Sequence, residues 1–323
     1  QHVMPNSYLK TAGSVWLDII AWGYDISRKA ASKAQGHIVF TRSTTDGALV
    51  IPAGTVINSK SIKNKVYQVK TLADATLADG VASLAVLCEA LANGDGHNLG
   101  AGYYIHPDQP INGISSVNNE SDWLTLPGQE TETDDDLRLR CRAKFLAVGN
   151  WHINAMYISI ITTFAEIGVN QVFMQNEAPR GPGTANAFIL MPTGEPSPTF
   201  LSDIQNHIMA DGYHGLGDDI QVQAMPGLAQ DIIATLAFVD AATSLEKSTL
   251  LIQVENFIRA AFRENTEYTA TLTLPHKTFA FSKLAAELHS QFPLLEQVSF
   301  NIDKIEHGLN ISRLNSLLVN EYV

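Results

Sequence analysis

Two Pro-Gly pairs divide the chain where its pattern of apolar residues changes, and this division limits the fold more than any other feature. Before Pro127-Gly128, short runs of β-branched and aromatic residues alternate with turn residues. After it, runs with helical spacing alternate with strand-like runs, and Pro226-Gly227 separates two such stretches. The length of 323 residues also favours two or three compact units. The sequence therefore predicts a multidomain α+β protein.

The first segment, residues 1–35, is predicted to be helical through Ala34. It carries several large apolar side chains, among them Trp16 and Trp22. A short helix cannot cover so much apolar surface by itself, so the segment needs a partner, either the body of the chain or another subunit. Packing within the chain is the commoner case for such side chains.

Residues 36–128 are expected to form a small antiparallel β-domain. Asp46-Gly47, Pro52 and Gly54 supply turns between its short strands. The apolar run at 81–92 fits a helix or a buried strand, and its flanking glycines favour the strand. A glycine-rich loop follows at 94–102. The other strands are expected at 37–42, 48–51, 55–58, 66–70 and 103–106.

A small α/β unit of ferredoxin-like type is predicted at 129–226. Helices are expected at 134–146 and across 156–164, where apolar residues fall on one face. Ser197-Pro198 is suited to begin a third helix, because the hydroxyl can cap it and proline fits the first turn. Strands are expected at 169–174, 185–191 and 220–224.

A second unit of the same type is predicted at 227–323. Thr243 and Glu246 form a capping box for its long helix. Ser282 is expected to cap a short helix that ends near Pro293. Strands are expected at 232–239, 268–274 and 297–302.

The charge balance excludes some classes of partner. The chain has 21 Lys and Arg against 33 Asp and Glu, a formal net charge of −12. It therefore lacks a positive field for nucleic acid or anionic lipid, and neither is expected as a main partner. Charged residues make up 17% of the chain, below the ~25% of a typical soluble domain. Either neighbouring subunits or uncharged polar residues cover the remaining surface, and composition leaves both open.

Targeting signals and cysteines give little further information about the function. No apolar run approaches the ~18 to 20 residues that cross a bilayer, and no signal segment opens the chain. The first residue is Gln1 rather than Met, so the natural start is expected upstream. Cys88 and Cys141 form no CxxC motif and are expected to be buried thiols.

The motifs of common enzyme classes do not occur in the sequence. Leu99 replaces the third glycine of a GxGxxG in the glycine-rich loop, and there is no GxxxxGK[ST], HExxH or GxSxG. His207 and His214 lie near a helix end without an obvious carboxylate partner. We therefore expect no catalytic residue, no cofactor and no metal site.

The densest charge cluster runs from Glu130 to Asp136 and continues into Arg138, Arg140 and Arg142. Its acids precede its bases, as the dipole of a helix start prefers, and Thr133 is the expected cap. Asp134 with Arg138, and Asp136 with Arg140, have the i, i+4 spacing of ion pairs worth ~0.2 to 0.5 kcal/mol each. A helix start in solvent or at an interface explains the cluster better than paired catalytic carboxylates, since no acid is placed across a cleft from it.

Several segments occur in an order that is known from one protein family. They are Thr11-Ala12-Gly13, Trp16-Leu17-Asp18, 34–40, Ile51-Pro52-Ala53-Gly54-Thr55, Tyr67, 94–100, 111–118, 128–140, Gly149, Tyr157 and 167–172. This order resembles the baseplate J-like proteins of contractile phage tails. The acidic helix start at 128–140 is the most specific segment, and the resemblance is carried by pattern alone after about Asn176. Ile167 stands where the family often has proline.

The resemblance implies a structural protein without catalysis. Such proteins are wedge components that pair, join into a six-fold ring around the tail hub and rearrange when sheath contraction is triggered. The implied partners are a second copy of the chain, other wedge proteins, the hub and the sheath-initiating proteins. The implied place is the tail baseplate of the virion, after assembly in the cytoplasm of the bacterial host. The candidate interface and hinge residues are Trp16, Trp22, Pro127, Gly128, Asp134, Asp136, Arg138, Arg140, Arg142, Pro226 and Gly227.

Two other hypotheses stay open at this point. A soluble acidic enzyme would have its pocket between the α/β units, around His97, His106 and Asp108. A receptor- or glycan-binding tail module would expose Trp123 and Tyr103 side by side on a shallow groove.

Overall fold

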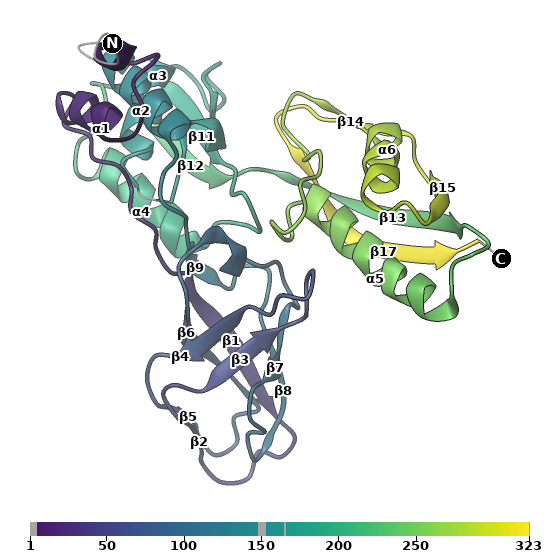
Figure 1. Ribbon diagram of the computed structural model, residues 1–323. Coiled ribbons are helices and arrows are strands. Elements are labelled where there is room, and N and C mark those ends of the chain that lie inside the picture. Colours follow the sequence, from purple (N-terminus) through teal and green to yellow (C-terminus); the bar gives the residue numbers. More distant parts are fainter. Residues whose placement is uncertain (1–4, 148–152, 165, 323) are drawn as a thin grey trace.

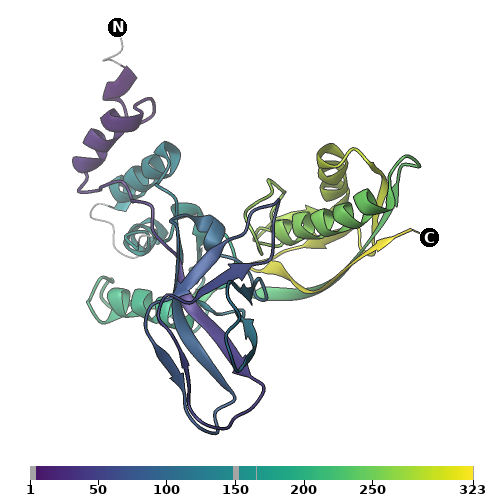
Figure 2. The same cartoon turned by 60° about the horizontal axis from the view of Figure 1, so that its bottom comes forward.

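The computed structural model describes residues 5–147, 153–164 and 166–322, and it has a mixed α+β fold. Figure 1 shows a β-rich part, two α/β parts and a helical N-terminal segment that lies against the first α/β part. The three larger parts meet in the middle of the molecule and extend from it in different directions, a shape that Figure 2 shows from a second side.

The N-terminal segment contains a 3-10 turn, Pro5–Ser7, and helix α1, Ser14–Trp22. The prediction of helix through Ala34 is wrong beyond Trp22. Gly23 ends the helix and Asp25 adopts a positive φ of 56°, which turns the chain back. Tyr24 and Ile26 then pack against the cluster that joins α1 to helix α2.

The β-rich part is a seven-stranded antiparallel sheet that nearly closes into a barrel. Its order is β7-β3-β4-β6-β1-β8, with β9 also paired to β1, and its edge strands β7 and β8 lie in contact. The expected strand at 81–92 is confirmed as β6, whereas β5, β8 and β9 were not anticipated. β2 and β5 form a separate two-stranded sheet at the far end of this part. The strands are β1 Gln35–Arg42, β2 Leu49–Ile51, β3 Val56–Ser59, β4 Gln68–Thr71, β5 Ala75–Leu77, β6 Ser83–Ala90, β7 Tyr104–Pro107, β8 Ile114–Asn118 and β9 Leu124–Leu126.

The central α/β part contains α2, Asp134–Ala147, α3, Asn154–Ile161, and the sheet β10-β11-β12. Its strands are Val172–Gln175, Thr184–Ile189 and Asp219–Ala224, and α4, Pro198–Met209, connects the parallel pair β11 and β12. Ser197 caps α4 as predicted, since its Oγ accepts from the Phe200 amide at 3.2 Å. The strand expected at 169–174 is shorter, because a 3-10 turn occupies Val169–Gln171.

The C-terminal α/β part has the sheet β15-β13-β17 with α5 and α6 on one face. The capping box of Thr243 and Glu246 is confirmed at the start of α5. The long parallel strand β17 was not anticipated. The elements are β13 Gly227–Phe238, α5 Ser244–Ala261, β14 Thr278–Ala280, α6 Phe281–Gln291, β15 Leu295–Phe300, β16 Lys304–Glu306 and β17 Ile311–Glu321.

Two expectations for this part are wrong. Residues 268–274 are irregular, because their backbone amides bond elsewhere: Thr273 N donates to Ala261 O at 3.2 Å and Thr271 N to the Glu287 carboxylate at 2.9 Å. Ser282 lies inside α6 and does not cap it. Strand β14 runs directly into this helix, whose first amide, Phe281 N, donates to Asp303 O at 2.9 Å.

Neither α/β part is ferredoxin-like in its described residues. That fold has a β-α-β-β-α-β order, whereas the main sheet of each part has three strands, with one parallel and one antiparallel pairing.

Candidate functional site

The start of α2 binds the N-terminal segment to the central α/β part. Thr133 is the predicted cap: its Oγ1 accepts from Asp136 N at 3.2 Å and donates to the Asp136 carboxylate at 2.6 Å. Asp134 accepts from Ser14 N at 2.8 Å and from the Arg28 guanidinium at 2.7 Å. These hydrogen bonds, the amide of Ser14 above all, hold the pKa of Asp134 below its usual value. The acidic helix start therefore positions α1.

The two i, i+4 ion pairs expected along α2 are not formed. Arg138 pairs with Asp135 instead and donates to Leu9 O at 3.1 Å and Ala12 O at 2.7 Å. Arg140 reaches back to Glu132 at 2.6 Å, and both side chains are mostly buried. The arginines turn this way because the N-terminal segment offers them fixed carbonyl acceptors, which no local spacing reveals. Arg142 is exposed and borders a surface hollow with Lys10.

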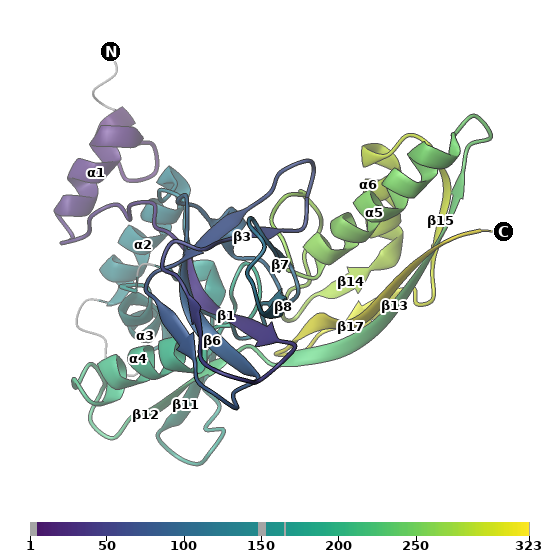
Figure 3. The ribbon, with the colours of Figure 1, turned by 90° about the horizontal axis from the view of Figure 1, so that it is seen from below.

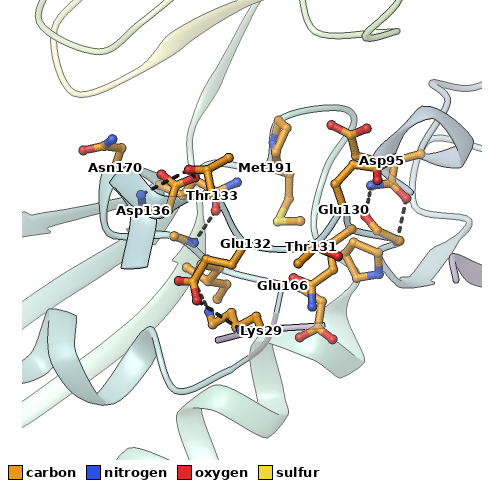
Figure 4. A pocket seen from close by; sticks show the side chains of 18 residues that line it. Lys29, Asp95, Glu130, Thr131, Glu132, Thr133, Asp136, Glu166, Asn170 and Met191 are labelled. Carbon is orange, nitrogen blue, oxygen red and sulfur yellow. Dashed lines mark hydrogen bonds between the residues drawn. The ribbon is translucent and has the colours of Figure 1, made fainter. Parts of the chain in front are cut away.

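A cavity of about 320 Å³, with several charged side chains in its lining, lies where the β-rich part meets the central part. In Figure 4, Glu130 and Asp95 lie at one end of it, Asp136 and Asn170 at the other, and Lys29 between them.

The side chain of Lys29 lines this cavity. Its Nζ donates to Phe164 O and Ile167 O, each at 2.7 Å. Burial, with a further contribution from Arg140, lowers its pKa to about 8. Burial also raises the pKa of Glu166 nearby. In the described ranges no three His, Cys, Asp or Glu side chains are placed to hold a metal ion. Through its two hydrogen bonds, Lys29 ties the N-terminal segment to the chain that follows α3.

The pair Pro127-Gly128 is buried and clamped. The Asn98 side chain accepts from Gly128 N and donates to Gly128 O, both at 2.7 Å. A Cβ at Gly128 would lie 2.5 Å from Gly94 O and 2.8 Å from Ala34 N, so only glycine fits. Motion at this junction would have to break both hydrogen bonds.

The pair Pro226-Gly227 is exposed; Pro226 lies between β12 and β13, and Gly227 is the first residue of β13. In Figure 1 the chain passes here from the central to the C-terminal part as a single extended strand. Pro226 O accepts from Ile311 N at 3.0 Å.

Two arginines hold the C-terminal part against the central part. Arg313 pairs with Glu195 at 2.9 Å and donates to Gly194 O at 3.0 Å. Arg263 is buried, has a φ of +67°, and accepts Gly194 N on its carbonyl at 3.0 Å. Burial, and to a lesser degree the charge of Arg313, lowers the pKa of Arg263 to about 10. Two like charges are thus buried at this contact.

The β3–β4 hairpin also reaches the C-terminal part. Glu267 accepts from the Tyr67 hydroxyl and pairs with Lys65 at 3.5 Å, while Lys63 donates to its backbone carbonyl. Gly100 N donates to Glu264 O at 2.9 Å. Since these residues are 150 positions or more apart in the printed sequence, no sequence signal pointed to them.

Helix α1 is covered on one side only. Leu17 and Ala21 are fully buried against Leu137 and Cys141 of α2. Trp16 and Trp22 remain 47% and 78% exposed. Packing within the chain therefore leaves this apolar stripe open.

The residues of the two alternative hypotheses are not arranged as those hypotheses require. Trp123 and Tyr103 are 3% and 4% exposed, so the expected glycan groove of these two rings is wrong. His97 is buried against Tyr67, and burial lowers its pKa. The surface hollow that Asp108 lines includes neither His97 nor His106.

Both cysteines are buried free thiols, as predicted, and burial raises the pKa of each. Among the helices that the structure describes, none has the length and apolar character needed to cross a membrane. No motif or spacing in the sequence singled out Lys29, Asn98 or Glu267. The glycine-rich loop that contains Asn98 was noticed only as a turn.

Comparison with known proteins gives three results. Residues 37–125 match the family model described as the baseplate J-like protein barrel domain. The chain is 36% identical over 299 residues to the putative baseplate protein gp29 of Haemophilus phage HP1, an alignment that covers 90% of this chain and 76% of that protein. It is also similar, at 12% identity and a TM-score of 0.37, to a chain in the six-fold symmetrised cryo-EM structure of the anti-feeding prophage baseplate, covering 91% of this chain and 79% of that one. A superposition with that score is too loose to support an argument.

Proposed function

Because the chain belongs to the family of baseplate J-like proteins, we propose that it is a structural subunit of the baseplate of a contractile phage tail or a related injection device. The observation that carries this proposal is the 36% identity to a putative baseplate protein over 90% of the chain. The alignment is far longer than the barrel match at 37–125 and so extends into the α/β parts.

Within the baseplate, the subunit acts as a wedge component. Two copies pair, the pairs join into a six-fold ring around the tail hub, and the ring contacts other wedge proteins and the sheath-initiating proteins. It performs no catalysis, takes no cofactor and assembles in the cytoplasm of the bacterial host. Its parts are the helical segment 1–35, the β-rich part 36–128, the central part 129–226 and the C-terminal part 227–323.

The apolar stripe of α1 is one contact surface of the ring. Trp16, Ile19 and Trp22 lie on it and are 47 to 78% exposed. A stripe with so much exposed aromatic area is typical of a surface that a partner covers. The acidic start of α2, through Asp134 and Arg28, holds this helix in place. Mutation of the cluster would therefore weaken the contact indirectly.

The rearrangement on triggering takes place at the Pro-Gly junctions. Pro226-Gly227 is exposed and connects two parts through a short link, which suits a hinge. Pro127-Gly128 is clamped by Asn98 and moves only if that clamp opens.

Deletion of the gene from a phage that carries it tests the proposal. We expect tails without a baseplate, no infectious particles, and recovery when the intact chain is supplied. Trp22→Glu should fail to restore infectivity, whereas Leu216→Glu, at a side chain that is 97% exposed elsewhere, should restore it. Intact, infectious particles that lack the chain would contradict the proposal.

A further inference from the structure

The sheet of the C-terminal part has one covered and one open face. On the covered face, Ile232, Ala234 and Leu236 are fully buried beneath α5 and α6. On the other face, Ile233 and Leu318 are 42% and 53% exposed. Figure 3 shows α5 and α6 on one side of β13 and β17, with no helix or strand of the described chain against the other side.

The open face lies mainly on a parallel pair of strands. β13 and β17 run parallel through ten residue pairs, from Gly227↔Ile311 to Leu236↔Glu321. In all-parallel sheets both faces are covered, and this mixed sheet, in which β15 pairs antiparallel with β13, has its parallel pairing over its two longest strands. The sheet order also leaves β17 at an edge, without a second partner strand among the described residues. The exposed face is therefore suited to be covered in an assembly.

The chemistry of the face favours contact with a protein. Ile233 and Leu318 lie directly opposite each other on β13 and β17 and form an apolar centre. Most of their neighbours are small or uncharged polar residues, and Asp231, directly opposite Ser316, is charged. An apolar centre inside a polar rim is the usual arrangement of an interface. The residues that the register places on this face are Asp231, Ile233, Thr235, Ala237, Gln297, Ser299, Ser316, Leu318 and Asn320.

We propose that this face packs against the same face of a second copy of the chain. The inference rests on the proposed function, because it assigns a surface to the pairing of subunits. Each copy carries a net charge of −12, so two copies can meet closely only where charge is sparse, and Asp231 is the one charged residue among the nine of the face. Its carboxylate already accepts from Ser316 Oγ at 2.5 Å and Asn315 Nδ2 at 2.8 Å.

The geometry also suits a two-fold contact. Two flat sheets with small side chains can pack face to face about 10 Å apart. A two-fold axis brings the same face of both copies together, so the face must be complementary to itself, and a flat face meets this condition. Ile233 and Leu318 of both copies then form one apolar centre.

The size of the face predicts a weak dimer. Strands of 12, 11 and 6 residues, at ~3.3 Å per residue and ~4.8 Å between strands, give roughly 450 Å² per copy. Two copies bury roughly 900 Å², below the ~1,200 to 2,000 Å² of stable complexes. The contact should therefore be reversible in solution and gain strength from the other contacts of a ring.

Sedimentation velocity of the purified full chain, over an about hundredfold range of concentration, tests this inference. We expect a monomer–dimer equilibrium that tightens when salt is added, because salt screens the repulsion between two acidic copies. Leu318→Glu should weaken dimerisation at least about tenfold, because it buries a carboxylate without a partner. Leu245→Glu is the matched control, since Leu245 is 77% exposed on α5 of the same part, and it should leave the dimer unchanged.

A second measurement is independent of that substitution. A bulky polar maleimide on Ser316→Cys should block dimerisation, whereas the same label on Ser248→Cys, on α5, should not. Both native cysteines are buried, which directs the label to the new thiol.

The inference is overturned if the wild-type chain stays monomeric or if salt weakens the dimer. It is also overturned if Leu318→Glu and labelled Ser316→Cys dimerise with normal strength. The proposed function still stands after any of these results, provided that the chain is required at the tail tip. Absence of the chain from tails would refute the proposed function whatever the dimer does.

Discussion

Replacement of Asn98 by alanine tests whether the junction between the β-rich and central parts is rigid. Asn98 is 3% exposed, and its side chain makes two hydrogen bonds of 2.7 Å with the backbone of Gly128. Gly128 is itself buried, in contact with Gly94 and Ala34. Water therefore cannot easily replace the lost amide.

The magnitude follows from the groups that lose their partner. Asn98→Ala leaves one backbone N–H and one C=O without a hydrogen bond in a buried place, and each such group costs about 1 to 3 kcal/mol. The expected loss of junction stability is thus about 2 to 6 kcal/mol. Since 1.4 kcal/mol is about tenfold in an equilibrium constant, the amide of Gly128 should exchange with solvent roughly 30- to 20,000-fold faster.

Native-state hydrogen exchange at Gly128 measures this effect directly. A thermal midpoint alone is a weaker test, because a chain of several parts need not unfold in one step. Asn58→Ala is the matched control. Asn58 is half-buried and bonds only to the side chains of Asp108 and Gln68, so its loss should change stability by less than about 1 kcal/mol. Exchange at Gly128 that rises less than about fivefold would refute the clamp.

Two further predictions concern the charged residues around α2. Glu132→Gln should lower the free energy of unfolding in urea by roughly 3 kcal/mol, because it leaves the mostly buried Arg140 without its counter-charge. Asp135→Asn is the control and should change this free energy little, since the Asp135 carboxylate is 91% exposed. Equal effects of the two substitutions would contradict the buried pair. Lys29 has a folded-state pKa of about 8 against 10.5 for the free group, so between these pH values the unfolded chain binds more protons and the free energy of unfolding should rise with pH. Lys29→Met should remove this rise in urea unfolding across the same pH range, and an unchanged slope would exclude Lys29 as its source.

The parts of the fold that were predicted from the sequence depend on local chemistry. Ser197 and the pair Thr243 and Glu246 were identified as caps because a hydroxyl three residues before an amide can bond to it wherever the helix lies. The flanking glycines were enough to assign strand β6. The order of the segments was enough to identify the family.

The parts that were missed depend on residues far apart in the chain. Residues 268–274 have the composition of a strand, but β17 takes the place beside β13 and leaves them without a ladder. Arg138 and Arg140 have the spacing for i, i+4 pairs along α2, yet Arg138 pairs with Asp135 and bonds to two carbonyls of the N-terminal segment, and Arg140 bonds to Glu132 before the helix. The spacing within a helix determines which ion pairs are possible, and hydrogen-bond acceptors from distant parts of the chain determine which of them form.

The two Pro-Gly junctions look alike in sequence but differ in what holds them, and this difference bears on which one moves. At Pro127-Gly128 the clamp is made of neutral, fully satisfied hydrogen bonds in a buried place, so opening it only costs free energy. Docking of the C-terminal part buries Arg263 and Arg313, and burial lowers the pKa of both. Undocking at Pro226-Gly227 would return both charges to water, which offsets in part the lost contacts, among them the Arg313–Glu195 ion pair. A triggered rearrangement needs a joint with two states of similar free energy, and we therefore propose that the C-terminal part is the one that moves in the proposed rearrangement.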